Sequence, residues 1–288
     1  MTDRLFQPPA DFAGVLTLED GGGGDTLDLG LLESGVDLSL DWATVWPING
    51  GAGEIQIPWA VTIENALGTN FGDRLRGNGA NNFIHGYWGS DALGGAGGDD
   101  TLVGGGGDDW IWGEDGDDWL YGEGDDDVLF GDAGNDTLVG GAGADSLEGG
   151  EGDDNLWSEA GVDTVQGGGG DDIVYGGDGA DSIGGQGGHD GLAGENGDDW
   201  IWGGEGHDVI NGGEGNDVFF GEGGIDRYLY NSWSRWDTIK DFEQGVDKLV
   251  FWDATSFADM SFRWWGTGVL IEYGDTHIYV ENSHLDDW

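Results

Sequence analysis

Residues 104–130 read GGGGDDWIW GEDGDDWLY GEGDDDVLF, three blocks of nine that place carboxylates directly beside Trp, Tyr and Phe. The same register continues without insertion or deletion from residue 68 to residue 229, which gives eighteen blocks. Position one is Gly except at Ser158, position six is Asp except at Asn82, and position eight is always Leu, Ile, Val, Phe or Tyr. Such strict columns indicate a repeat architecture, so we take the nonamer as the unit of the fold.

Each column of the repeat has a physical explanation. The first six positions are rich in Gly and end in Asp, and Gly adopts the backbone angles of a turn that other residues resist. The last three positions predict a very short strand, with position eight facing inward and positions seven and nine facing outward. Two turns and two strands would make one coil of eighteen residues. The spacing therefore predicts an all-β fold, a parallel β-roll (β-solenoid) of about nine coils in which stacked coils form two sheets.

The charge of the chain shows what such a roll needs. The 288 residues include 59 acidic and eight basic ones, for a formal net charge of −51, and no Lys or Arg lies between residues 77 and 226. About two apolar side chains per coil cannot offset the ordering entropy of eighteen residues. Stacked carboxylates also repel one another unless a hard cation lies between them, and Ca²⁺ accepts six to eight oxygen ligands. We therefore expect calcium ions from solution to supply the compensating charge.

Composition and motifs exclude several functions. The negative charge argues against nucleic-acid binding and against anionic membrane surfaces. No apolar run is long enough for a membrane span, and the N-terminal residues lack the apolar core of a secretory signal. The sequence contains no HExxH motif and no Cys. The Asp-Asp pairs recur with the repeat rather than marking one site, and His189 and His207 fall in turns where we expect solvated residues rather than zinc ligands. We predict that the chain is not an enzyme.

The repeated pattern GGxGxDxUx resembles the RTX (hemolysin-type) calcium-binding nonapeptide repeat. The resemblance implies a right-handed parallel β-roll with calcium held between successive turns, by the Asp side chain at position six and by the carbonyls of positions two and four. About sixteen ions would fit, and they would reduce the net charge to about −19. Asn82, Phe71 and Asp125 depart from the pattern and alter individual sites.

The implied side-chain ligands are Asp73, Asp91, Asp100, Asp109, Asp118, Asp127, Asp136, Asp145, Asp154, Asp163, Asp172, Asp181, Asp190, Asp199, Asp208, Asp217 and Asp226. The implied position-four glycines are Gly89, Gly98, Gly107, Gly116, Gly134, Gly143, Gly152, Gly161, Gly170, Gly179, Gly188, Gly197, Gly206 and Gly215.

The flanks of the repeat predict two further segments. DTLDLG (25–30) and VTIENALGTNFGD (61–73) are similar to the segment that leads into the β-roll of serralysin-type secreted proteases. Residues 237–251 and 268–282 resemble the segment that closes it. We predict an N-terminal β cap over 1–67, the roll over 68–229, and a C-terminal β cap over 230–288 that ends in a type I secretion signal. Basic residues near both ends of the repeat would lie where the calcium ladders stop.

Aromatic side chains recur at the outward positions seven and nine. They predict rows on the sheet surfaces that either stabilise the sheet or bind an extracellular glycan or partner protein. One row comprises Tyr121, Val139, Trp157 and Tyr175, and two patches on the other sheet comprise Trp110, Trp112, Val128 and Phe130, and Trp200, Trp202, Val218 and Phe220. The candidate ligand-binding residues are Trp110, Trp112, Trp119, Tyr121, Trp157, Tyr175, Trp200 and Trp202.

Three functions are consistent with these features. The first is a secreted calcium-binding β-roll, exported by the type I secretion machinery and folded by extracellular calcium. The second is an extracellular adhesin or polysaccharide-binding protein that uses the aromatic rows. The third is a non-catalytic module of a larger serralysin-like enzyme.

Overall fold

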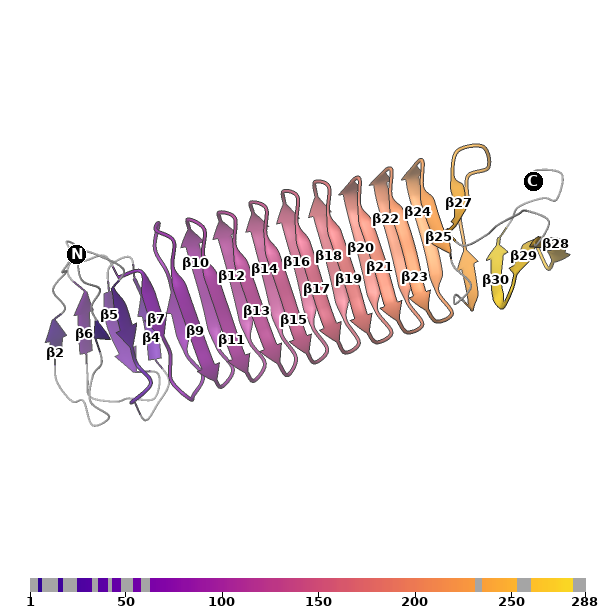
Figure 1. Cartoon of the computed structure of the whole chain (residues 1–288). Coiled ribbons are helices and arrows are strands. Elements are labelled where there is room, and N and C mark those ends of the chain that lie inside the picture. The colour runs from indigo at the N-terminus through magenta and orange to yellow at the C-terminus, as the bar shows by residue number, and fades with distance from the viewer. Residues whose placement is uncertain are drawn as a thin grey trace. The chain divides into compact units, whose positions relative to one another are not determined.

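The computed structural model describes residues 5–6, 15–17, 25–32, 36–40, 43–47, 54–57, 63–230, 235–252 and 260–281 (Figure 1). Every regular element in these ranges is a strand, and none of them contains a helix that could cross a membrane. The chain divides into two compact units, residues 1–146 and 147–288, and each is described by itself.

The first unit contains two parallel ladders of strands. One ladder has the order β1 (Leu5–Phe6), β3 (Thr26–Asp28), β7 (Asn65–Leu67), β9 (Phe83–Trp88), β11 (Thr101–Gly106), β13 (Trp119–Gly124) and β15 (Thr137–Ala142). The other has the order β4 (Val36–Ser39), β8 (Arg74–Arg76), β10 (Ala92–Gly97), β12 (Trp110–Asp115) and β14 (Val128–Ala133). Strands β5 (Ala43–Pro47) and β6 (Glu54–Ile57) add antiparallel pairings, β2 (Val15–Thr17) pairs with β6, and β16 (Ser146–Glu151) falls at the boundary between the units.

The second unit repeats this arrangement. One ladder has the order β17 (Asn155–Ala160), β19 (Ile173–Asp178), β21 (Gly191–Asn196), β23 (Val209–Glu214), β25 (Arg227–Tyr230) and β27 (Lys248–Phe251). The other runs from β18 (Thr164–Gly169) through β20 (Ser182–Gly188), β22 (Trp200–Gly206), β24 (Val218–Gly224) and β26 (Trp236–Ile239) to β30 (Thr276–Val280). Strands β29 (Gly268–Tyr273) and β28 (Met260–Trp265) complete this sheet in antiparallel orientation.

The register of these ladders confirms the predicted coil. Trp110 pairs with Val128 in the first unit, and Trp200 pairs with Val218 in the second, so neighbouring strands are one coil of eighteen residues apart. The all-β parallel roll expected from the nonamer is therefore confirmed. The predicted boundaries of the caps stay a prediction, although strands of both flanks continue the parallel ladders.

The strands are longer than the predicted triplets. Strand β12, for example, covers positions seven to nine of one block and continues through positions one to three of the next. The turn is therefore confined to the middle of the nonamer. The longer strand forms more backbone hydrogen bonds with the neighbouring coils. Without them, these N–H and C=O groups would lack partners inside a thin roll.

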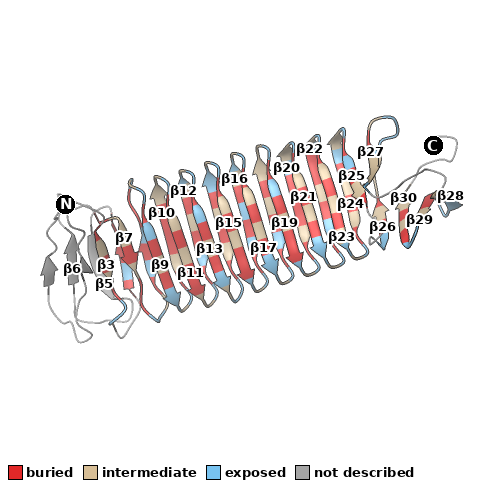
Figure 2. Cartoon of the chain, in the orientation of Figure 1, coloured by how far each residue is buried: buried red, intermediate tan, exposed pale blue. Residues whose placement is uncertain are grey.

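The core is a stripe of position-eight side chains (Figure 2). From Leu75 to Tyr228 each of these side chains is at most 2% exposed. The burial pattern of β12 and β13 shows a second buried position, the Gly at position one of the next block. Inward-facing residues therefore alternate between a large apolar side chain and no side chain at all.

Candidate calcium-binding site

The position-six aspartates are buried and connect successive coils. Asp109 and Asp208 are fully buried, and one carboxylate oxygen of each accepts a hydrogen bond from a backbone N–H one coil earlier. The Asp91 N–H donates to Asp109 Oδ1 at 2.7 Å, and the Asp190 N–H donates to Asp208 Oδ1 at 3.0 Å. This carboxylate-to-amide bond recurs along each column of the described turns, so Oδ1 contributes to the stacking of the coils.

In many of these carboxylates the second oxygen, Oδ2, is buried without a hydrogen-bond donor. Burial of an acceptor without a donor or a cation costs free energy, more so for a charged group. The atoms in this situation are Oδ2 of Asp91, Asp100, Asp109, Asp118, Asp127, Asp172, Asp181, Asp190, Asp199, Asp208 and Asp217.

The position-one glycines make room for this oxygen. A Cβ on Gly86 would lie 2.0 Å from Asp91 Oδ2 and 2.8 Å from the carbonyl oxygen of Gly104, one coil further on. The columns of Gly and Asp are therefore coupled, because the carboxylate occupies the space that any other side chain would fill. A carboxylate oxygen and a carbonyl oxygen face the same small space, and both are acceptors, so a proton or a cation must stabilise the pair.

Ser158 shows how the exception at position one is accommodated. Its side chain is fully buried, and its hydroxyl donates to the carbonyl oxygen of Gly176 at 2.5 Å. Here a neutral donor supplies the contact to the carbonyl of the next coil.

The pKa values of the position-six carboxyls are raised. Burial raises the pKa of Asp109 to about 7, although the hydrogen bond from the Asp91 backbone opposes the shift. Burial likewise raises the pKa of Asp127 to about 8, with a contribution from the charges of Asp109 and Asp145. Where no cation is bound, burial therefore favours the protonated form of these carboxyls near neutral pH.

The turns direct carbonyl oxygens along the stacking direction. Position-four glycines such as Gly116 have positive φ, and the carbonyl oxygen of Gly98 lies 1.9 Å from the point where a Cβ of Gly116 would be. Position two behaves in the same way, since the carbonyl oxygen of Glu123 lies 2.1 Å from the corresponding point of Gly141. Both positions named as carbonyl ligands thus direct an oxygen toward the next coil.

The residues that depart from the repeat occupy the same places in the turn as the Asp or Gly that they replace. Asn82 puts Oδ1 where the Asp oxygen would lie, and its Nδ2 donates to the Glu64 carbonyl at 2.9 Å, so this side chain brings its own donor. Asp125 adopts the positive φ of the position-four glycines, 74°, and its side chain accepts a hydrogen bond from the Gly107 N–H at 3.1 Å. Phe71 is half exposed.

The structure extends the aspartate columns beyond the eighteen blocks. Asp237 Oδ1 accepts from the Asp217 N–H, and Asp247 Oδ1 accepts from the Asp226 N–H, both at 3.1 Å. Burial raises the pKa of Asp237 to about 8. Sequence reasoning missed these residues because the glycines are absent there and the spacing is 20 or 21 residues instead of 18. The tetrads DTIK (237–240) and DKLV (247–250) keep the D-x-U-x signal that would have found them.

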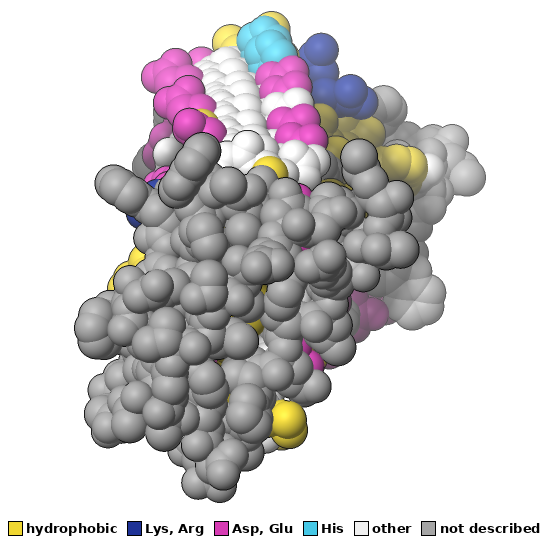
Figure 3. Space-filling model, turned by 90° about the vertical axis from the view of Figure 1, so that its left-hand side faces the viewer, with side chains coloured by type: hydrophobic (Ala, Val, Ile, Leu, Met, Phe, Trp, Pro, Cys, Tyr) yellow, Lys and Arg dark blue, Asp and Glu magenta, His cyan; other side chains and the backbone are white. Residues whose placement is uncertain are grey.

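A second ladder at position five was also missed. Asp117 Oδ1 accepts a hydrogen bond from the Asn135 N–H at 2.9 Å, and Asp126 and Asp153 accept equivalent bonds from the following coil. Figure 3 shows acidic side chains gathered in rows on the described surface. His189 and His207 replace Asp in this ladder. The His207 N–H donates to His189 Nδ1 and the Ile225 N–H donates to His207 Nδ1, both at 2.9 Å, and the two rings stack at 4.9 Å. The Asp-Asp pair that recurs at positions five and six of the blocks was the sequence feature that could have predicted this ladder.

Three of the basic residues, Arg76, Lys240 and Arg263, form surface ion pairs with glutamates. Arg76 pairs with Glu114, and Lys240 Nζ lies 2.9 Å from Glu281 Oε2. Such exposed pairs contribute little to stability. In the described turns they do not compensate the position-six carboxylates, so the proposed role of these residues at the ends of the calcium ladders stays a prediction.

Any cation in the turns would depend mainly on backbone oxygens. Within the described ranges, no three Asp, Glu or His side chains gather closely enough to hold a metal ion by themselves. One carboxylate per turn, combined with the carbonyl oxygens of positions two and four, is a donor set of hard oxygens of the kind that Ca²⁺ prefers.

The outward aromatic residues form stacked clusters in each unit. In the first unit the rings of Trp112 and Phe130 stack at 6.2 Å with an interplanar angle of 9°. In the second unit Trp202 and Phe220 stack at 5.5 Å and 5°. Position seven is more exposed than position nine in these clusters: Trp110 is 50% exposed, whereas Trp112 is partly buried.

Comparison with known proteins agrees with this geometry. Residues 94–129, 103–138, 130–165, 157–192 and 193–228 match the RTX calcium-binding nonapeptide repeat (4 copies), and residues 8–93 match the family described as Peptidase M10 serralysin C terminal. The fold and the turns define a parallel β-roll of calcium-binding repeats. Residues 94–228 therefore carry RTX calcium-binding repeats, and the segment before them is similar to the serralysin C-terminal family, which confirms the resemblance of the repeat and of residues 61–73.

Individual relatives are matched over part of their length. The metallopeptidase AprA of Pseudomonas marginalis is 39% identical over 70 residues, which are 24% of this chain and 15% of that protein. The extracellular lipase LipA of Serratia marcescens has a TM-score of 0.27 and 16% identity over 75% of this chain and 38% of its own. The matched serralysin segment is the non-catalytic C-terminal part of that family.

Proposed function

We propose that this chain is a secreted, non-enzymatic calcium-binding β-roll that folds when extracellular calcium fills its turns. The observation that carries the proposal is the buried Oδ2 of position-six aspartates such as Asp91, Asp118 and Asp199, which faces a carbonyl oxygen of the next coil and has no donor. Ca²⁺ between stacked turns would bind the carboxylate and the carbonyls of positions two and four. About sixteen such ions would also remove most of the self-repulsion of the chain.

The proposed sequence of events follows from charge. Without calcium the carboxylates either repel or must take up protons, so the chain stays unfolded and suited to passage through a type I secretion channel. Millimolar calcium outside the cell would then supply the free energy of folding, because binding and folding are coupled.

Far-UV circular dichroism tests this proposal directly. The purified chain in EDTA at pH 8 should lack β structure and gain it cooperatively at roughly 0.1–1 mM calcium, with magnesium ineffective because it demands a tighter octahedral shell. A chain that is folded in EDTA and indifferent to calcium would contradict the proposal.

A single substitution tests the assigned ligands. Asp118→Asn should lower the calcium stoichiometry measured by isothermal titration calorimetry and raise the midpoint of calcium-induced folding. Asp115→Asn is the matched control, because this substitution removes the same charge at an exposed position three residues away. Equal effects of the two substitutions would indicate diffuse charge rather than a ligand.

A second candidate function is an extracellular binding surface formed by the aromatic clusters. The observation that favours it is that Trp110 and Trp200 are about half exposed although they lie on regular strands. Large exposed apolar groups mark interaction surfaces more often than chance. Glycan-array binding that is lost in Trp112→Ala or Trp157→Ala, with the calcium response intact, would support it, and unchanged binding would contradict it.

A further inference from the structure

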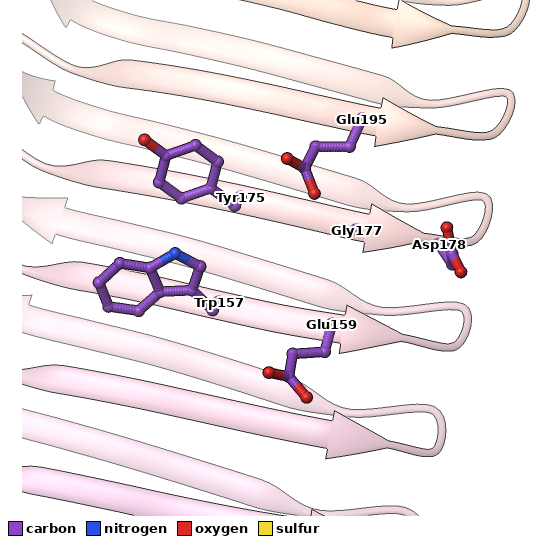
Figure 4. Close-up of a pocket in the computed structure, with 6 residues that line it drawn as sticks. All are labelled: Trp157, Glu159, Tyr175, Gly177, Asp178 and Glu195. Atoms are coloured by element: carbon purple, nitrogen blue, oxygen red, sulfur yellow. The ribbon is translucent and has the colours of Figure 1, made fainter.

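A groove on the first sheet of the second unit combines aromatic rings with carboxylates. It has a volume of about 310 Å³ and is lined by Trp157, Glu159, Tyr175, Gly177, Asp178 and Glu195 (Figure 4). The residues come from three neighbouring strands, β17, β19 and β21, so the register of the roll fixes their positions.

The aromatic wall of the groove is a stacked pair. The rings of Trp157 and Tyr175 lie 5.9 Å apart with an interplanar angle of 7°. Their neighbour on the next coil is Ala193, which pairs with Tyr175 and presents only a methyl group. The row of rings therefore ends at β21 and leaves space beside Tyr175.

The acidic side of the groove is built from position two of the same strands. Gly177 pairs with Glu195 on one side, and on the other the carbonyl oxygen of Glu159 lies 1.9 Å from where a Cβ of Gly177 would be. Gly177 thus keeps the floor open between two glutamates, whose Cα atoms are about 10 Å apart at two strand spacings. Figure 4 shows both carboxylates on the side of the rings.

No ion pair among the described residues involves the glutamates of this surface. The sequence from residue 77 to 226 contains no Lys or Arg, and Glu159 and Glu195 are exposed. Asp178 differs, because its Oδ1 accepts a hydrogen bond from Asn196 Nδ2 at 2.7 Å. Two exposed carboxylates beside two ring faces provide the two elements that bind an organic cation, opposite charge and a π surface.

We propose that this groove binds an organic ammonium group, with the cation over the rings of Trp157 and Tyr175 and its charge compensated by Glu159 and Glu195. A hard metal ion would need more oxygen ligands than two separated glutamates supply. A neutral sugar would use the rings but would gain little from the carboxylates. The inference requires the folded roll and goes beyond calcium binding in the turns.

Choline is a suitable probe, and its uncharged analogue in which carbon replaces nitrogen is the matched control. Ligand-observed NMR of the methyl protons, with the full chain saturated in calcium at low salt, should show choline binding at least about tenfold more tightly than the analogue. Equal affinity for the two, or binding of cellohexaose in place of choline, would overturn the proposal.

Substitutions then locate the site. Glu159→Gln combined with Glu195→Gln should weaken choline binding by about tenfold, and Tyr175→Leu by a similar factor. Glu205→Gln, which removes an exposed carboxylate from β22 in the other sheet, should leave the affinity unchanged. A loss in Glu205→Gln as large as in the glutamate pair would show a diffuse charge effect and overturn the assignment.

Circular dichroism of the same samples separates this proposal from the calcium roll. If Tyr175→Leu does not reach the wild-type β signal in calcium, the two surface glutamate substitutions still decide the outcome. If the wild-type chain folds with calcium and choline does not bind, the groove proposal fails while the calcium proposal stands.

Discussion

At the scale of single residues, Gly and Asp within one block form a unit. The Asp carboxylate lies where the side chain of position one would be, and its Oδ1 binds the backbone of the previous coil. A substitution at position one should therefore act through the aspartate rather than through backbone flexibility.

Strand β13 offers a matched pair of glycines for this prediction. A Cβ on Gly122 would lie 2.3 Å from Asp127 Oδ2 and 2.6 Å from the Gly140 carbonyl oxygen, whereas a Cβ on Gly124 would meet nothing within 4 Å. We expect Gly122→Ala to lower the free energy of unfolding in calcium by about 2 kcal/mol through overpacking. Gly124→Ala should be neutral or slightly stabilising, within about 1 kcal/mol. Urea unfolding checks both, and equal effects would contradict the account.

At the scale of the turns and strands, the aspartate columns couple folding to pH. Their pKa values, between about 6 and about 8, lie above the value of an unfolded Asp, so the folded metal-free roll binds more protons than the unfolded chain. The free energy of unfolding of the metal-free roll should therefore rise as pH falls from about 8 toward the unfolded Asp pKa of about 4, and it should be lost as pH rises through about 6 to 8.

Calcium should reverse this dependence. Protons compete with the cation for the same oxygens, so the calcium midpoint should shift to higher concentration as pH falls through about 7. Circular dichroism in EDTA and in calcium, each at several pH values, measures both trends. A metal-free chain that gains no β structure on mild acidification would contradict the assignment of the buried carboxyls.

The aromatic clusters also act at the scale of strands. Trp202 on β22 and Phe220 on β24 stack across adjacent coils, and such pairs contribute about 0.5–1.5 kcal/mol beyond their buried area. A double-mutant cycle with Trp202→Ala and Phe220→Ala should give a coupling free energy of this size, measured by urea unfolding in calcium. A coupling near zero would leave binding as the main reason for this cluster.

At the scale of the whole molecule, the net charge of −51 opposes compaction. Small-angle scattering in EDTA at pH 8 should give a radius of gyration near the roughly 60 Å of an unfolded chain of this length. Calcium should reduce it sharply. Sodium chloride at equal ionic strength should not reduce the radius of gyration in this way. Charge screening places no divalent cation between the buried Oδ2 atoms and the carbonyl oxygens. A chain compacted equally by sodium chloride would indicate charge screening alone.

The sequence by itself determined the architecture. A strict period of nine, with Gly, Asp and an apolar residue in fixed columns, allows a stacked coil of eighteen residues, and the parallel register and the buried position-eight stripe were predicted for that reason. The aspartates were identified as the chemical feature of the turns because a repeating carboxylate without basic partners requires an external cation.

Only the tertiary structure decided how the atoms are used. It showed that the strands extend through position three, that position one is buried beneath the carboxylate, and that Asp237 and Asp247 continue the columns at altered spacing. It also placed Glu159 and Glu195 on either side of Gly177, beside two stacked rings. The physical reason is that these contacts join residues one coil apart, so they depend on how each turn closes and on which side chains become neighbours through stacking, which the order of residues within one block does not specify.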